Sequence, residues 1–149
     1  MAQISENSNQ RRSIGITFLA IVNLVALVFR LLFWGIVYIR RLVPFPAELI
    51  SLADRANSAV TYGFMIGDIY YAAPLLLLAW IGLWKLKSWG WMTAQMVNAL
   101  WVYSMTVISL RDAYTSMSSG ALLFLPFSFV AVWAIPYLWV NRRKFGVMD

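Results

Sequence analysis

Two charged residues inside long apolar segments are the side chains best placed to do chemistry in this sequence. Arg30 lies within an apolar run at residues 13–39, and Asp68 lies within another at residues 61–84. A charge inside a transmembrane segment costs roughly 2.5–3.5 kcal/mol, so it usually has a partner or a function. At ~1.5 Å per helical residue, both charges fall about 10–13 Å from the same edge of their segments. We therefore predict an ion pair between Arg30 and Asp68.

Three interpretations of these two charges stay open at the level of sequence. The pair can neutralise its own charge and thereby specify how the helices pack. It can instead act as a working pair that gates or binds a polar solute. Alternatively, Arg30 extends alone to the lipid headgroups, because a long side chain can bury its stem and keep its charge in water.

A second polar level is predicted nearer the opposite edge. Asn23 precedes Arg30 by seven residues, which places both on one helical stripe, and Asn98 has a similar depth in its own apolar segment. Gln95 lies about one turn from Asn98. Hydrogen bonds among Asn23, Gln95 and Asn98 would hold the segments together. The alternative is that all three line one polar path with Arg30 and Asp68.

The absence of certain residue types restricts the chemistry further. The chain contains no Cys and no His, which excludes disulfides, thiolate chemistry, His-ligated metals and Ser/His or Cys/His nucleophiles. General acid–base catalysis requires titratable groups within reach of a substrate, and the apolar segments offer one carboxylate that faces an arginine. We expect no catalytic residues, no metal and no cofactor.

The elements that carry these residues are predicted to be membrane helices. Of the 149 residues, 62% are hydrophobic and 12% are charged, with a mean hydropathy of +0.72, whereas about 25% of residues are charged in soluble domains. The expected fold is an all-α integral membrane four-helix bundle. We predict a disordered leader at 1–12, a four-helix domain at 13–140 and a tail at 141–149. The expected spans are residues 13–39, 61–84, 89–110 and 119–140.

The connection at residues 40–60 is the longest one, and it predicts an additional short helix. Pro44 and Pro46 end the first span, and Pro46 can begin a helix at residues 47–58 that lies in the membrane interface. This helix would be either a lid or docking element, or an ordinary interfacial linker.

Small and imino residues within the spans predict packing and bending. Gly63 and Gly67 form a G-x-x-x-G pattern, which allows a neighbouring helix to approach closely. Pro74, Pro126 and Pro136 lie inside predicted spans, and each removes a helical hydrogen bond, so we expect kinks there.

Lys and Arg in the connections predict the orientation. One side carries seven of them and the other carries four, which places both termini in the cytoplasm. The net charge of +6 is then explained by anionic lipid at the plasma (inner) membrane, not by nucleic acid. The two sets are Arg11, Arg12, Lys85, Lys87, Arg142, Arg143 and Lys144, and Arg40, Arg41, Arg55 and Arg111.

The segment Gly82-Leu83-Trp84-Lys85-Leu86-Lys87-Ser88-Trp89-Gly90-Trp91 resembles the cytoplasmic hairpin of many small, uncharacterised prokaryotic four-span proteins. This resemblance implies a prokaryotic plasma-membrane protein, and it implies no activity and no site residues.

The expected function is that of a non-catalytic accessory or interaction subunit of a membrane assembly. Its expected partners are membrane lipids and either other subunits or further copies of the chain. The first alternative is a small oligomeric transporter or channel that uses Arg30 and Asp68. The second is a membrane enzyme that acts on lipids.

Overall fold

The computed structural model describes residues 12–115 and 123–147, which form helices and no strands. The α-helices are α1 (Ile14–Ile39), α2 (Leu52–Gly67), α3 (Ala73–Trp84), α4 (Ser88–Thr115) and α5 (Leu125–Val140). Short helical turns are η1 (Pro46–Glu48), η2 (Asp68–Ala72) and η4 (Arg142–Phe145). The predicted all-α class is confirmed. The predicted leader falls almost entirely outside the described residues.

Two of these helical segments are long and apolar enough to cross a membrane. One is Ile14–Ile39, and the other is Leu52–Trp84, where α2, η2 and α3 follow one another without a break over 33 residues. Leu125–Val140 is also apolar but shorter. A bilayer core of about 30 Å requires ~20 helical residues.

The separate interfacial helix predicted at residues 47–58 does not form. Only the single turn η1 appears there, Ser51 is extended, and the helix that begins at Leu52 runs directly into the predicted second span. Between Leu52 and Thr61 no Pro or Gly interrupts the chain, so a helix started at Leu52 has nothing to end it. The prediction was wrong because η1 is a single turn and residues 52–58 belong to α2.

The loop between α1 and α2 folds back onto the first turns of α2. The Phe45 ring stacks on Tyr62 with 5.0 Å between centroids, and the Tyr62 hydroxyl donates a 2.8 Å hydrogen bond to the Val43 carbonyl. Ser58, which is buried, donates to the Pro44 carbonyl. These contacts fix the start of α2 relative to the end of α1.

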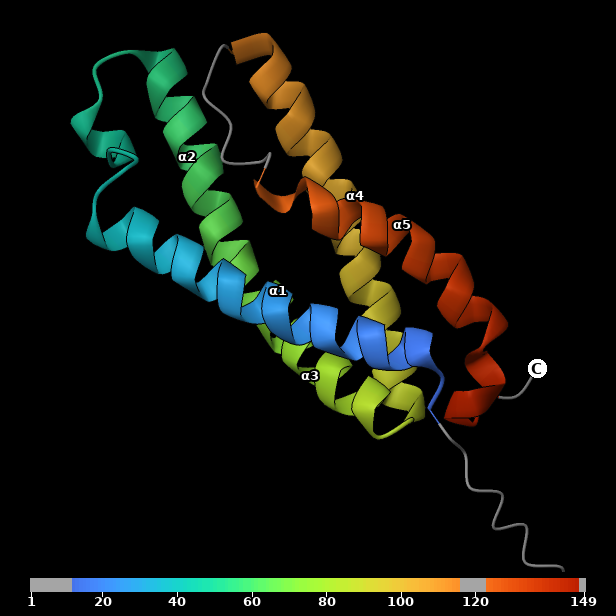
Figure 1. Cartoon of the computed structure of the whole chain (residues 1–149). Coiled ribbons are helices and arrows are strands. Elements are labelled where there is room, and N and C mark those ends of the chain that lie inside the picture. Colours follow the sequence, from blue (N-terminus) through green and yellow to red (C-terminus); the bar gives the residue numbers. More distant parts are fainter. Residues whose placement is uncertain (1–11, 116–122, 148–149) are drawn as a thin grey trace, which may run out of the picture.

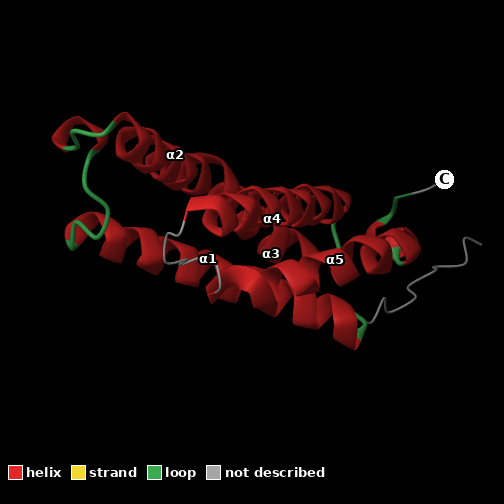
Figure 2. Ribbon diagram, turned by 90° about the horizontal axis from the view of Figure 1, so that it is seen from above, coloured by secondary structure: helices red, strands yellow, loops and turns green. Residues whose placement is uncertain are grey.

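The helices pack tightly toward one end of the molecule and diverge toward the other (Figure 1). α3 packs against both α1 and α4, and α4 packs against α5, whereas α2 packs mainly against the elements next to it in the chain. Seen from above, α2 lies apart from α1 (Figure 2). The buried core at the tight end is rich in small side chains: Ile16, Leu19, Ala20, Ala79, Leu83, Ala94, Ala134, Leu138 and Phe145.

The turn between α3 and α4 brings two glycines into backbone contact. A Cβ built on Gly90 would collide with the backbone of Gly82, so neither helix can approach this closely with a larger residue. Leu86 takes a left-handed conformation (φ 52°), and Lys87 donates a 2.9 Å backbone hydrogen bond to Gly82. This is a Schellman helix end. Arg41 (φ 48°) ends α1 in the same way.

Gly63 and Gly67 do not mediate helix packing. A Cβ built on either glycine would meet no atom within 4 Å, so the predicted close approach was wrong. The G-x-x-x-G spacing gives one smooth face on α2, but the neighbouring helices pack elsewhere.

The three prolines differ in their effect on the helices. Pro126 lies in the first turn of α5, because that helix begins at Leu125, so the kink predicted there was wrong. Residues 119–122 of the predicted span lie outside the described residues. Pro74 lies in the first turn of α3, directly after η2. Pro136 lies inside α5, where a helical hydrogen bond is lost.

Beyond α5, η4 buries Phe145 in the core at 3% exposure.

Contact between the glycine backbones predicts a sharp difference between two matched substitutions. Gly90→Ala should lower the free energy of unfolding by about 1–3 kcal/mol, because its Cβ overpacks the α3–α4 crossing. Gly63→Ala adds the same methyl group to open space and should leave stability unchanged or slightly higher, since Ala favours helix over Gly. Thermal unfolding of both purified variants in one detergent measures this, and equal midpoints would contradict the tight crossing.

Candidate functional site

The predicted charged residues meet between α1 and η2. Arg30 Nη1 lies 2.7 Å from Asp68 Oδ1, and the two side chains are 6% and 18% exposed. Trp34, one turn beyond Arg30, donates its indole N–H to Asp68 Oδ2 at 2.7 Å. Each carboxylate oxygen therefore accepts a hydrogen bond from α1. Charge-assisted bonds of this kind are stronger than neutral ones.

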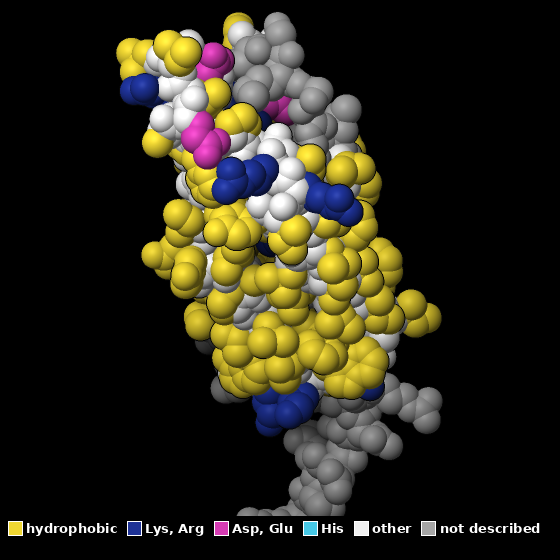
Figure 3. All heavy atoms as spheres, turned by 90° about the vertical axis from the view of Figure 1, so that its left-hand side faces the viewer, with side chains coloured by type: hydrophobic (Ala, Val, Ile, Leu, Met, Phe, Trp, Pro, Cys, Tyr) yellow, Lys and Arg dark blue, Asp and Glu magenta, His cyan; other side chains and the backbone are white. Residues whose placement is uncertain are grey.

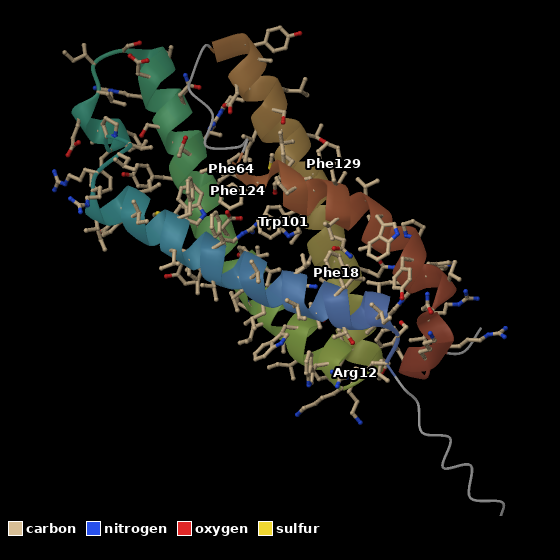
Figure 4. The ribbon with its side chains drawn as sticks, in the orientation of Figure 1. Arg12, Phe18, Phe64, Trp101, Phe124 and Phe129 are labelled. Carbon is tan, nitrogen blue, oxygen red and sulfur yellow. The ribbon has the colours of Figure 1, made fainter. Side chains whose placement is uncertain are left out.

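The aromatic ring of Trp101 supports the arginine from α4. The Arg30 guanidinium carbon lies 4.1 Å from the Trp101 ring centroid, a cation–π geometry. Trp101 in turn stacks on Phe127 of α5 at 5.4 Å. In Figure 4, Trp101 lies beside Phe64 and Phe124 in the interior, between the ribbons. The Arg30 side chain of α1 is thus held by Asp68 of η2 and Trp101 of α4.

A π-helical turn places Asp68 at a break in the regular helix. In η2, the Ala73 N–H bonds to the Asp68 carbonyl, five residues back. Pro74 has no N–H, so a regular α-helical bond to the Tyr70 carbonyl is impossible there. The π-type hydrogen bond of Ala73 lets the helix continue although Pro74 has no donor. Such π-turns are frequent at functional sites.

Two cavities adjoin the ion pair. The first measures about 160 Å³ and lies between α1, α2 and α4; its walls include Arg30, Trp34, Phe64, Asp68, Trp101 and Phe124. The second measures about 340 Å³ and lies between α2 and α4; its walls include Gly63, Gly67, Tyr71, Leu100, Tyr103 and Ser104. Arg30, Phe64, Asp68 and Ser104 line both. The charged pair therefore lies between two adjoining hollows and forms part of the wall of each.

The second polar level is not joined by hydrogen bonds in the described chain. Asn23 is buried and donates to the Leu19 carbonyl of its own helix at 2.7 Å, while Gln95 donates to the Ile135 carbonyl of α5 at 3.1 Å. Asn98 is also buried. A side chain that bonds to the carbonyl four residues back satisfies itself locally. The three residues therefore do not form the predicted cluster.

Three residues of this region were not predicted. Trp34 follows Arg30 by four residues, so helical periodicity would have placed it beside the charge. Trp101 and Arg111 belong to α4, and no spacing in the sequence relates them to Arg30. Arg111 donates to Asp112 at 2.9 Å and to Thr61 at 3.1 Å, and it lines the first cavity.

Comparison with protein-family models, with curated proteins and with solved structures gives no match for this chain.

The buried pair predicts strongly coupled substitutions. Arg30→Leu and Asp68→Asn should each destabilise the protein, by about 3–5 kcal/mol where one buried charge is left alone. The double variant leaves no charge and should recover most of this loss. Unfolding free energies of the four proteins measure the coupling. Purely additive losses would contradict a direct ion pair.

Proposed function

We propose that the chain is an integral membrane protein in which α1, the α2–α3 segment, α4 and α5 each cross the bilayer. The supporting observation is its apolar exterior. In Figure 3, hydrophobic side chains cover the middle of the visible face, and Lys and Arg lie above and below them. Large apolar side chains are widely exposed, among them Ile14 at 90%, Phe129 at 72% and Val140 at 78%. Surfaces this apolar are stable in lipid and not in water.

The proposed orientation places both termini in the cytoplasm of a prokaryotic cell. Arg12 lies over the Trp84 ring at 4.0 Å, so the start of α1 meets the end of α3. Ser13 bonds to the Tyr137 hydroxyl of α5 at 2.9 Å, at the same end. The basic residues of these ends meet there, whereas Glu48, Asp54 and Asp112 belong to the opposite end. The majority of Lys and Arg faces the cytoplasm in membrane proteins.

Single cysteines test this topology, because the chain has no Cys of its own. Ser51 and Lys87 are exposed and lie just before and just after the Leu52–Trp84 segment. Ser51→Cys should react with a membrane-impermeant maleimide in intact cells, and Lys87→Cys only after permeabilisation. The reverse pattern contradicts the orientation, and labelling of both on one side contradicts a crossing.

We further propose that the protein acts without catalysis as an accessory or interaction subunit of a membrane assembly. The observation that carries this proposal is the incomplete packing of α2, which leaves a hollow between α2 and α4 at the diverging end. Exposed aromatic side chains, including Tyr70 at 71% and Tyr103 at 65%, flank this region. Aromatic residues are enriched where proteins associate.

An accessory subunit should purify with a partner in fixed ratio. Mild extraction of the tagged full-length chain, followed by native mass spectrometry, should give a complex of constant stoichiometry. Tyr103→Ala should weaken that complex, while Ile14→Ala at the opposite end serves as a control with a similarly exposed side chain. A single homogeneous species without a partner would contradict the accessory role and favour solute transport at Arg30 and Asp68.

A further inference from the structure

Arg30 carries more hydrogen-bond donors than the described residues satisfy. A guanidinium has five N–H donors, and the hydrogen bond of Arg30 to Asp68 is its only one within the described chain. Nε is buried without a partner, in a side chain that is 6% exposed and lines both cavities. A buried donor left unsatisfied costs about 1–3 kcal/mol. A bound acceptor would remove this cost.

The local charge balance favours a neutral acceptor over an anion. Arg30 is neutralised by Asp68 at 2.7 Å, and Arg111 pairs with Asp112 at 2.9 Å. A carboxylate or phosphate would add an uncompensated charge to a region shielded from water, where the cost of desolvation is several kcal/mol. A carbonyl oxygen accepts the free N–H donors without adding charge.

The first cavity has the size and walls of a site for one flat ring. Its volume is about 160 Å³, and an engineered apolar cavity of about 150 Å³ binds benzene. Trp34, Phe64, Trp101 and Phe124 surround it. Aromatic side chains stack on planar rings and meet their edges in preferred geometries.

The second cavity lies along α2 and offers room for an apolar chain. Gly63 and Gly67 are part of its α2 wall, beside Val60 and Phe64, and a Cβ on either glycine would meet nothing within 4 Å. A hydrocarbon tail is thin enough to enter between α2 and α4.

We propose that the two cavities form one binding site for a membrane quinone. Its ring occupies the first cavity, one ring carbonyl accepts a hydrogen bond from Arg30, and its apolar tail leaves along the glycine wall of α2. The proposal deepens the role of this region within the proposed membrane protein and rests on that embedding. It concerns binding alone and includes no electron transfer.

Tryptophan quenching by a benzoquinone that carries a ten-carbon tail tests the site on the purified full-length chain in detergent. We expect saturable quenching, because Trp34 and Trp101 line the ring cavity. Gly67→Leu fills the second cavity and should weaken binding at least about tenfold, a change of ~1.4 kcal/mol. Gly35→Leu is the matched control: a Cβ there also meets nothing within 4 Å, and Gly35 lines neither cavity.

Several outcomes would overturn the proposal. If quenching does not saturate and is equal in the unaltered chain, Gly67→Leu and Gly35→Leu, the quinone only partitions into the detergent and binds no site. Unchanged affinity in a folded Gly67→Leu protein, or in Gly63→Leu if the first variant does not fold, excludes the site. If a glycerolipid purifies with the chain in stoichiometric amount and the quinone does not displace it, the occupant of the site is that lipid and not a quinone. Cysteine labelling reports the topology independently, so a chain that crosses the membrane and fails to bind the probe refutes only the ligand.

Discussion

One guanidinium–carboxylate contact inside an apolar bundle joins α1 to the second helical segment at η2, next to the part where α3 itself packs against α1. Apart from this contact, the hydrogen bond from Arg111 of α4 to Thr61 and the loop that folds onto its first turns, α2 has little packing of its own. Arg30 reaches Asp68, Trp34 binds the other carboxylate oxygen, and Trp101 supports the cation from α4. Because burying two charges is costly, such a pair adds little to total stability.

The two ends of the bundle are built on different principles. At the end near the chain termini, Gly82 and Gly90 touch through their backbones, and the core consists largely of alanine and leucine. At the other end, aromatic rings surround the hollows beside Arg30, and Gly63 and Gly67 face open space. Close packing resists a change of shape, so the open end can deform more easily than the packed end.

Helical rise and apolar length predicted much of this structure, and local features without a sequence signal account for the rest. Equal depths along two helices were enough to pair Arg30 with Asp68, because the rise per residue is constant. The spacing of Gly63 and Gly67 did not reveal whether another helix packs on that face, since a smooth face forms whether or not a neighbour occupies it. Arg41 and Leu86 adopt left-handed conformations that usually indicate glycine. Trp101 joins the site through tertiary packing, which spacing along one helix cannot report.

The π-turn at Asp68–Ala72 also shifts the positions of side chains around the helix axis, so α2 and α3 do not follow one continuous α-helical periodicity. A π-turn holds one residue more than the α-helical turn it replaces, and each residue of an α-helix advances the chain by about 100° around the axis. The residues of α2 therefore lie about 100° from where an unbroken α-helix would place them relative to α3, and loss of one residue in the π-turn would restore an unbroken α-helix in which α2 and α3 still face as they do now. Loss of one residue within the π-turn would therefore shorten the span and leave the packing of α3 unchanged. The orientation of Asp68, which lies in the turn, would change.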